Sequence, residues 1–429
     1  MSSKGLYKLG MGILVLLMVL LPLLACAPPA PPPPPPVTKP DKVVFHHFGD
    51  LSGPYAAITA PIVAGVNDLC VYYNTEKGGI DGVKVDQVFR DTGGKLDAAL
   101  AAYSAFKESK PYPILVMLYG SAEGEALRDR FVEDKIACFT NSPSPTCMYP
   151  PGYEFSSIPS YTDSMGAFID WVTSDWSKKT GQPVKLAILT WDSTFGKAIM
   201  VDEVRNYAKS KGVEIVYEGV YGMRDLDVST QMTTIKDKGA NWVYNNTLAH
   251  GPKVVLGAAE ALKVLNHNLY DAAAGTLHVA SGPWGMDESC LLLAGPALSE
   301  GMVGPRSFAS WSETDNPGVK LVVSIADKNN RQAKERVMGY LGVIAGVNMC
   351  FDAIGKAAKA VGWDKLNGTA IKDQFIKMNN YDSMGITKYT YTTTKPESTS
   401  TRIFKAEGGK LLPVTGWVTC PDLKPATAK

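Results

Sequence analysis

Six short segments of the chain share the residue types that bind a small organic molecule. Each follows an apolar, strand-like stretch and combines hydroxyl groups, small residues and aromatic rings; they are residues 52–55, 119–124, 140–146, 191–196, 245–250 and 281–285. Hydroxyls can hold a polar group, the first turn of a following helix offers free N–H groups for a carboxylate, and aromatic rings can wall an apolar side chain. Any one segment could equally be a simple turn, but six with the same chemistry predict a binding site.

Motifs of the common catalytic classes are missing from the sequence. It contains no G-x-G-x-x-G, Walker loop, H-E-x-x-H or G-x-S-x-G pattern, and only five histidines. His46 and His47 are adjacent on a predicted strand, so they point to opposite faces and cannot share a metal ion. We therefore predict no enzymatic activity, no metal site and no cofactor.

The six segments are positioned by alternating strand-like and helix-like stretches. From residue 43 to 141 the order is β-α-β-α-β-α-β, with the first helix expected to begin near Pro61 and to stop at Gly78 and Gly79. A similar alternation runs from 168 to 282, followed by a long helix at 340–362 and a terminal hairpin formed by 388–394 and 400–414. This pattern predicts an α/β fold with two Rossmann-like lobes, each built on a central, mostly parallel sheet. Ligands of such sheets bind beyond the carboxyl ends of the strands, so we expect the cleft between the lobes to hold the site.

Length and composition agree with this organisation. The chain has 429 residues, too many for a typical single core, with 45% hydrophobic and 20% charged residues. The formal net charge is only +1, which argues against nucleic acid or anionic lipid as a partner.

The N-terminus has the pattern of an export signal. Lysines precede an apolar run that ends at Leu24-Ala25-Cys26, and a proline-rich stretch follows. We predict a signal peptide at 1–25 and a lipidated Cys26 with a proline-rich tether at 26–42. The alternative is an ordinary signal peptide with an incidental cysteine. The protein is thus expected to be exported, periplasmic or at the cell surface, and attached to the membrane only through its N-terminal lipid.

Six cysteines remain in the exported part of the chain. An even number in an oxidising compartment permits disulfides, although spacing does not define the pairing. Cys138 and Cys147 flank a proline-rich loop and are the best candidate pair.

From about residue 43 to 420 the sequence resembles the Leu/Ile/Val-binding protein family, the substrate-binding proteins of ABC importers with the type I periplasmic fold. The stretches that carry the resemblance are "LSGPYA", "NTEKGGIDGVKV", "FSSIPS", "LAILTWDSTFGKAI", "DVSTQMTTIKDKGANWVY" and "SEGMVG". The resemblance implies a three-stranded hinge with crossovers near residues 160, 305 and 384. Lobe 1 would then comprise 43–159 plus 306–383, and lobe 2 would comprise 160–305 plus 384–429.

The family resemblance also implies which residues contact the ligand. Ser121, Ser142 and Ser144 would hold its α-carboxylate and α-ammonium from lobe 1. Phe195, Thr247 and Trp284 would contact it from lobe 2, and Tyr55 would close the side-chain end.

One departure from the family pattern concerns the helix after "YG". It carries Glu123 and Glu125 in its first turn, where acids already complement the helix dipole. If Glu123 faces the cleft, it disfavours a bare carboxylate and favours an ammonium or amide; an exposed position is the equal alternative. For Glu125 an exposed position is favoured.

The resulting hypothesis is a monomeric solute-binding lipoprotein of an ABC importer. It would bind an amino-acid-like molecule, branched-chain by family default, or an aromatic or amide compound, by cleft closure, and deliver it to a permease in the cytoplasmic membrane. A ligand-sensing module of a membrane signalling system is the alternative. An enzyme on this scaffold would need a nucleophile with a base, or a metal cluster, and the sequence has neither.

Overall fold

The computed structural model of the protein describes residues 39–426, so the predicted signal peptide and Cys26 lie outside the described residues. Its first sheet has five parallel strands in the order β2-β1-β3-β4-β5. The strands are β1 (Lys42–Gly49), β2 (Lys84–Asp91), β3 (Leu115–Leu118), β4 (Ala137–Thr140) and β5 (Glu154–Ser156). The strand order changes direction between β1 and β3, which makes the carboxyl ends of these two strands the expected place for a ligand.

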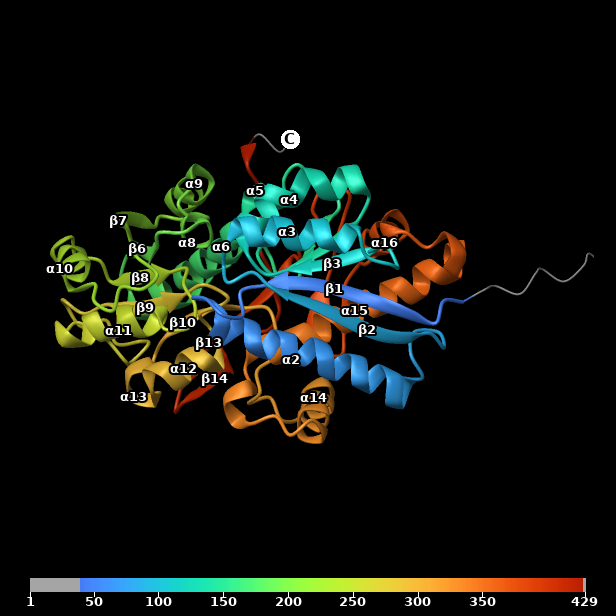
Figure 1. The fold of residues 1–429 in the computed structure, drawn as a ribbon. Coiled ribbons are helices and arrows are strands. Elements are labelled where there is room, and N and C mark those ends of the chain that lie inside the picture. Colours follow the sequence, from blue (N-terminus) through green and yellow to red (C-terminus); the bar gives the residue numbers. More distant parts are fainter. Residues whose placement is uncertain (1–38, 427–429) are drawn as a thin grey trace, which may run out of the picture. The chain divides into compact units, whose positions relative to one another are not determined.

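Helices cover both faces of this sheet, as Figure 1 shows. The apolar side chains of β3 alternate: Leu115 and Met117 join the core formed with α2 and α15, whereas Val116 and Leu118 pack with α3 and α4. This alternation is the two-residue period of a strand buried on both faces. The helices are α2 (Ala56–Tyr72, extended by a π-helical turn at Tyr73–Lys77), α3 (Leu96–Lys107), α4 (Ser121–Asp134), α5 (Pro145–Met148), α14 (Pro317–Lys328), α15 (Met338–Val361) and α16 (Gly368–Phe375).

The second sheet combines a parallel part with an antiparallel edge. Its order is β14-β13-β10-β9-β8-β6-β7, where β6 to β10 run parallel and β13 and β14 are antiparallel. The strands are β6 (Lys185–Trp191), β7 (Glu214–Tyr221), β8 (Trp242–Asn245), β9 (His278–Ser281), β10 (Val303–Arg306), β13 (Ser400–Glu407), β14 (Lys410–Pro413) and the short β15 (Val418–Thr419), which pairs with β13. The helices of this part are α6 (Tyr161–Trp171, extended by a π-helical turn at Val172–Trp176), α7 (Ser177–Thr180), α8 (Thr194–Lys197), α9 (Asp202–Ser210), α10 (Ser229–Asp237), α11 (Gly251–Ala261), α12 (Glu288–Ala294) and α13 (Pro296–Ser299). The predicted α/β fold with parallel-sheet cores is confirmed.

Three stretches of chain connect the two sheets. The first follows β5, and the second follows β10, close to the positions expected near residues 160 and 305. The third lies later than the expected residue 384, because the rings of Tyr389 and Tyr391 still pack against Phe139 and Phe155 of the first sheet.

The predicted terminal hairpin was also partly wrong. β12 (Thr387–Tyr389) pairs with β11 (Tyr381–Ser383) in a separate two-stranded sheet, and the hairpin consists of β13 and β14 alone. The third connection runs between these two pieces, where Ser156 forms a bridge with Glu397.

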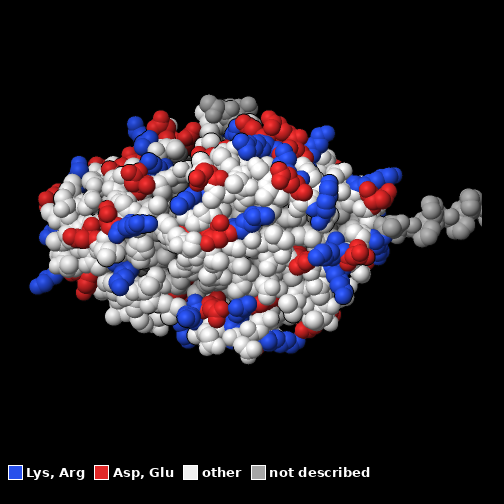
Figure 2. All heavy atoms as spheres, in the orientation of Figure 1, with Lys and Arg blue, Asp and Glu red and all other residues white. Residues whose placement is uncertain are grey.

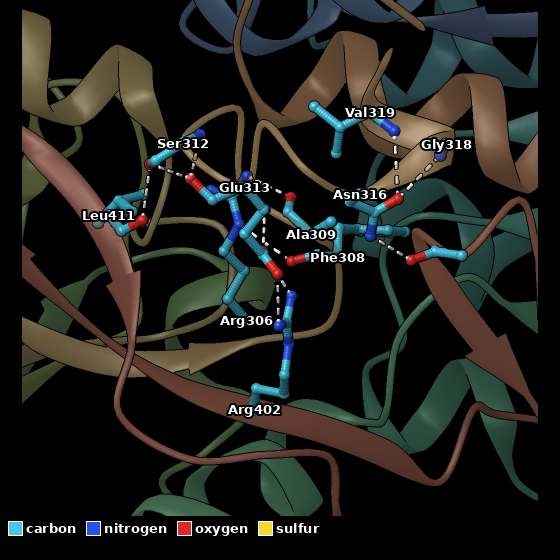
Figure 3. Close-up of polar contacts among 12 residues, drawn as sticks. Arg306, Phe308, Ala309, Ser312, Glu313, Asn316, Gly318, Val319, Arg402 and Leu411 are labelled. Atoms are coloured by element: carbon cyan, nitrogen blue, oxygen red, sulfur yellow. Dashed lines mark hydrogen bonds and ion pairs between the residues drawn. The ribbon is translucent and has the colours of Figure 1, made fainter. Parts of the chain in front are cut away.

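The second connection is held by two arginines, as Figure 3 shows. The fully buried Arg306 donates to the carbonyls of Phe308 and Ala309 and forms an ion pair with Glu288. Arg402 of β13 forms a two-fold hydrogen-bonded pair with Glu313 (2.7 and 2.8 Å). Because Glu313 is on the connecting segment and Arg402 is in the second sheet, this pair fixes the path of the chain as it leaves β10.

Charged side chains of both signs are interspersed on the face seen in Figure 2, in keeping with the near-zero net charge. Within residues 39–426, two helices, Ala56–Lys77 and Met338–Val361, are long and apolar enough to cross a membrane by length and composition. Most of Met338–Val361 is buried within the protein, as expected for a core helix.

Candidate ligand-binding site

A cavity of about 300 Å³ lies between the carboxyl ends of the two sheets. Its lining comes from the segments that follow β1, β2, β3 and β4 on one side and β6, β7, β8 and β9 on the other, together with the start of α6. The volume is at the lower end of the range for small-molecule sites. Because both sheets contribute, a molecule in this cavity would contact both at once.

The turn after β1 is organised by Asp50. This side chain is 3% exposed and accepts hydrogen bonds from the backbone N–H groups of Gly53 (2.5 Å) and Tyr55 (2.9 Å). With the turn fixed in this way, α2 begins at Ala56, earlier than the predicted start near Pro61, and the proline lies within the helix. Asp50 is therefore a cap of the loop, although it also lines the cavity.

Tyr55 reaches from this turn to the opposite sheet. Its ring lines the cavity, and its hydroxyl donates to Sδ of Met223, in the segment after β7 (3.1 Å). Burial raises the pKa of Tyr55 to about 12, so the hydroxyl keeps its proton at neutral pH. The contact therefore joins the two walls of the cavity at one end.

The first turn of α4 contributes Ser121 and Glu123 to the lining. Ser121 Oγ is buried and has no hydrogen-bond partner within residues 39–426. Glu123 is 7% exposed, and its carboxylate folds back over Gly120, where any Cβ atom would overlap it. Burial is the main cause of the raised pKa of Glu123, and the nearby charge of Asp50 adds to it. Glu123 has no ion-pair partner within residues 39–426, so its charge is stabilised only by its own backbone N–H and the N-terminal end of α4.

The segment after β4 and the start of α6 add further polar groups. Ser142 lines the cavity, but its hydroxyl already donates to the carbonyl of Tyr119. Tyr161, the first residue of α6, also lines the cavity; its hydroxyl is buried and lacks a partner in the described part of the chain. Burial raises the pKa of Tyr161, so its hydroxyl can donate at neutral pH. An unpaired buried hydroxyl costs free energy, which a ligand can recover by bonding to it.

Aromatic rings form the wall on the side of the second sheet. Phe195 packs edge-on against Tyr161, with ring centroids 5.0 Å apart, and Trp284 lies 6.4 Å from Phe308. Both Phe195 and Trp284 line the cavity and are almost fully buried. Across the cavity, Ile58 of α2 supplies an aliphatic surface. These groups suit the apolar body of a ligand.

Six of the predicted contact residues therefore meet around one cavity: Tyr55, Ser121, Glu123, Ser142, Phe195 and Trp284. Ser144 does not line it, because its side chain caps α5 and donates to Glu125 Oε1 (2.6 Å). Glu125 is consequently half-buried, rather than exposed as predicted. Thr247 is also absent from the lining; it is fully buried and donates to Asn245 Oδ1 (2.5 Å).

The predicted disulfide between Cys138 and Cys147 is not formed, since both cysteines are free thiols. The thiol of Cys147 instead contacts the hydroxyl of Ser144 (3.1 Å) and the carbonyl of Ser121 (3.4 Å). The other cysteines within residues 39–426 are also free and buried.

Sequence reasoning missed several lining residues, among them Asn141, Tyr161, Met223 and Leu248. Asn141 and Leu248 lie in two of the six predicted ligand-binding segments, next to the predicted contact residues Ser142 and Thr247. Tyr161 follows the first crossover, and the start of a helix at that point was a usable signal. Met223 comes from the segment after β7, which has no hydroxyl-rich or aromatic pattern.

Comparison with known proteins identifies a family to which the chain is similar. The model of the periplasmic binding protein family matches residues 47–410. No curated protein sequence matches the chain.

Solved structures share the fold at low sequence identity. A branched-chain amino acid ABC transporter protein from Thermus thermophilus with bound valine has 21% identity and a TM-score of 0.79, covering 90% of this chain and 98% of that one. A fatty acid ABC transporter substrate-binding protein from Thermomonospora curvata has 18% identity and a TM-score of 0.75, covering 90% and 96%. A solute-binding protein from Rhodopseudomonas palustris HaA2 in complex with p-hydroxybenzoic acid has 17% identity and a TM-score of 0.74, covering 90% and 100%. With the family model matched over most of its length, this chain belongs to the periplasmic binding protein family.

Proposed function

We propose that the protein is an extracytoplasmic solute-binding lipoprotein that captures a small organic molecule in the cavity between its two sheets and delivers it to an ABC permease. The observation that carries this proposal is the cavity itself, which is lined from both sheets by hydroxyl and aromatic side chains. Two of the solved structures named above support it, since they are ABC transporter proteins with bound valine and p-hydroxybenzoic acid.

The proposed mechanism is closure of two lobes around the ligand. Lobe 1 would contain 43–159 and the chain from 306 to just beyond Tyr391, and lobe 2 would contain 160–305 and the remaining C-terminal part. Contacts such as that between Tyr55 and Met223 would form in the closed state and break in the open state. A ligand that touches both lobes favours the closed state through its higher affinity for it.

The first test is to identify the ligand. Native mass spectrometry of the purified full-length mature protein would detect a retained molecule, and a thermal-shift screen would cover amino acids, aromatic acids, amines and amides. A ligand present at about 100 times its Kd adds roughly 2.7 kcal/mol to the free energy of unfolding. Small-angle X-ray scattering should then show a smaller radius of gyration with that ligand. If no compound shifts the melting temperature and none is retained, the proposed function is wrong.

The lipid anchor and the permease require separate tests. Cys26→Ser should release the protein from the membrane fraction. Mass spectrometry of the N-terminal peptide should detect a lipid in the unsubstituted protein and none in the variant. Deletion of the ABC permease proposed to receive the ligand should abolish uptake of the identified ligand. Continued uptake together with a signalling defect would favour a sensing module instead.

A further inference from the structure

We infer that the ligand is an organic ammonium ion without a free carboxylate, with Glu123 as its counter-ion. This inference rests on the proposed function and specifies the chemical class that the cavity accepts. It departs from the branched-chain amino acids expected from the family resemblance, in which the hydroxyls near the start of α4 would hold a carboxylate.

The charges around the cavity are the first argument. Its lining contains the carboxylates of Asp50, Glu123 and Asp192 and no lysine, arginine or histidine. Asp192 is largely exposed and paired with Lys197 (2.8 Å), and Asp50 is occupied by two backbone N–H groups. Glu123 has no ion-pair partner among the residues that the structure describes. A buried acid without a cation is unfavourable unless a ligand supplies one or the acid is neutral.

The position of Glu123 is the second argument. It is the third residue of α4, and its carboxylate folds over Gly120 in front of the first turn. The N-terminus of a helix is the usual place for a ligand carboxylate, because free N–H groups and the positive end of the dipole point there. Here the protein's own carboxylate lies at that place. A ligand carboxylate would meet a like charge, whereas an ammonium group would meet an opposite one.

The remaining lining completes the description of the ligand. Tyr55, Phe195 and Trp284 supply aromatic rings to the lining, a residue type that can attract a cation and pack against an apolar body. Ser121 Oγ and the Tyr161 hydroxyl are 4% and 1% exposed as residues and lack partners within 39–426. Both can bond to one further polar group of the ligand, such as a hydroxyl or an amide. The class is thus an amine of roughly amino-acid size with an apolar or aromatic body.

Isothermal titration calorimetry of the full-length mature protein tests this with matched pairs of compounds. The pairs are leucinamide and leucine, phenethylamine and phenylalanine, and 4-hydroxybenzylamine and 4-hydroxybenzoate. We expect at least one amine to bind at least about tenfold more tightly than its carboxylate partner, because the carboxylate of the partner would lie beside the like charge of Glu123. Equal or tighter binding of the carboxylates would overturn the inference and leave the proposed function intact, whereas no binding by any compound of the wider screen would overturn both.

Two variants show whether Glu123 is the counter-ion. Glu123→Gln keeps the shape of the side chain and should weaken binding of the amine at least about tenfold. Glu125→Gln, two residues further along α4 and outside the cavity lining, should change it less than twofold. Thermal unfolding of each variant controls for folding. An unchanged amine affinity in Glu123→Gln contradicts the assignment.

The dependence of affinity on pH gives an independent readout. Glu123 faces Asp50 and Tyr55, with Asp192 on the opposite wall, and burial holds its pKa above the ordinary value. A cation bound beside it lowers that pKa, so binding releases a proton whenever Glu123 is protonated in the free protein. Amine affinity should therefore fall as the pH is lowered, and the fall should be absent in Glu123→Gln. A pH dependence identical in both proteins would contradict the assignment.

Discussion

Lys395 lies on the third connection between the sheets and forms ion pairs with three carboxylates. Its Nζ is 2.6 Å from Asp163, 2.8 Å from Asp422 and 3.6 Å from Glu397. The side chains of Asp163 and Glu397 are fully buried, and Tyr149 donates a further hydrogen bond to Glu397 (2.7 Å). Replacing Lys395 with methionine keeps most of the volume of the side chain but leaves two buried acids without their cation.

The expected loss of stability follows from that arrangement. Removal of one partner of a buried ion pair costs about 3–5 kcal/mol, because the remaining charge is desolvated and unpaired. Burial raises the pKa of Glu397 to about 7 even with the lysine present. A carboxyl whose pKa is higher in the folded than in the unfolded state contributes most to the free energy of unfolding at pH values below its unfolded-state pKa. It loses that contribution as the pH rises through its folded-state pKa, here about 7. Without Lys395 the pKa of Glu397 rises further, so the loss should be larger at pH 8 than at pH 5. The part due to Glu397 is at most about 1.4 kcal/mol, because pH 8 lies one unit above its present pKa.

Urea unfolding followed by tryptophan fluorescence at pH 5 and pH 8 measures this difference. Lys356→Met is the matched control, since the pair of Lys356 with Asp352 is exposed and should contribute less than about 1 kcal/mol. A loss below about 1 kcal/mol for Lys395→Met at pH 8, or equal losses at both pH values, would refute the reasoning.

Three further substitutions test the assigned cavity. Trp284→Ala should weaken binding of the native ligand at least about tenfold in calorimetry, as it removes a cavity wall; unchanged affinity would mean that the ligand binds elsewhere. Gly120→Ala should reduce binding by displacing Glu123, whereas Gly257→Ala, with open space around its Cβ, should leave binding unchanged, and equal effects would contradict the geometry. Thr247→Ala should lower the free energy of unfolding by about 1–3 kcal/mol, measured in urea, with little change in ligand affinity. A loss of affinity without a loss of stability would mean that Thr247 contacts the ligand.

The fold could be predicted largely because its strands are short apolar runs that alternate with helical patterns. Residues such as Leu115 and Val116 face different helices, yet both are apolar, as a sheet covered on both faces requires. The third connection could not be placed, because Tyr389 and Tyr391 have the pattern of a strand in either lobe. Only their packing against the first sheet decides where the chain crosses.

The sequence indicates which loops form the site, but not which side chains of those loops face the cavity. Ser142 and Ser144 are two residues apart in the same loop, and only the first faces the cavity, while the second caps a four-residue helix. Thr247 and Leu248 are adjacent, and the hydroxyl of the former bonds within its own loop. Such choices depend on local backbone direction and on hydrogen bonds to neighbouring loops, neither of which residue type or spacing encodes.

The contact between Tyr55 and Met223 has a kinetic consequence. If the lobes close around the ligand as proposed, this hydrogen bond between the two walls must break before an enclosed molecule leaves. The residence time of the ligand is then limited by the opening rate of the protein as well as by the strength of its own contacts. Tyr55→Phe would consequently shorten the lifetime of every bound compound by a similar factor, whatever its chemical class.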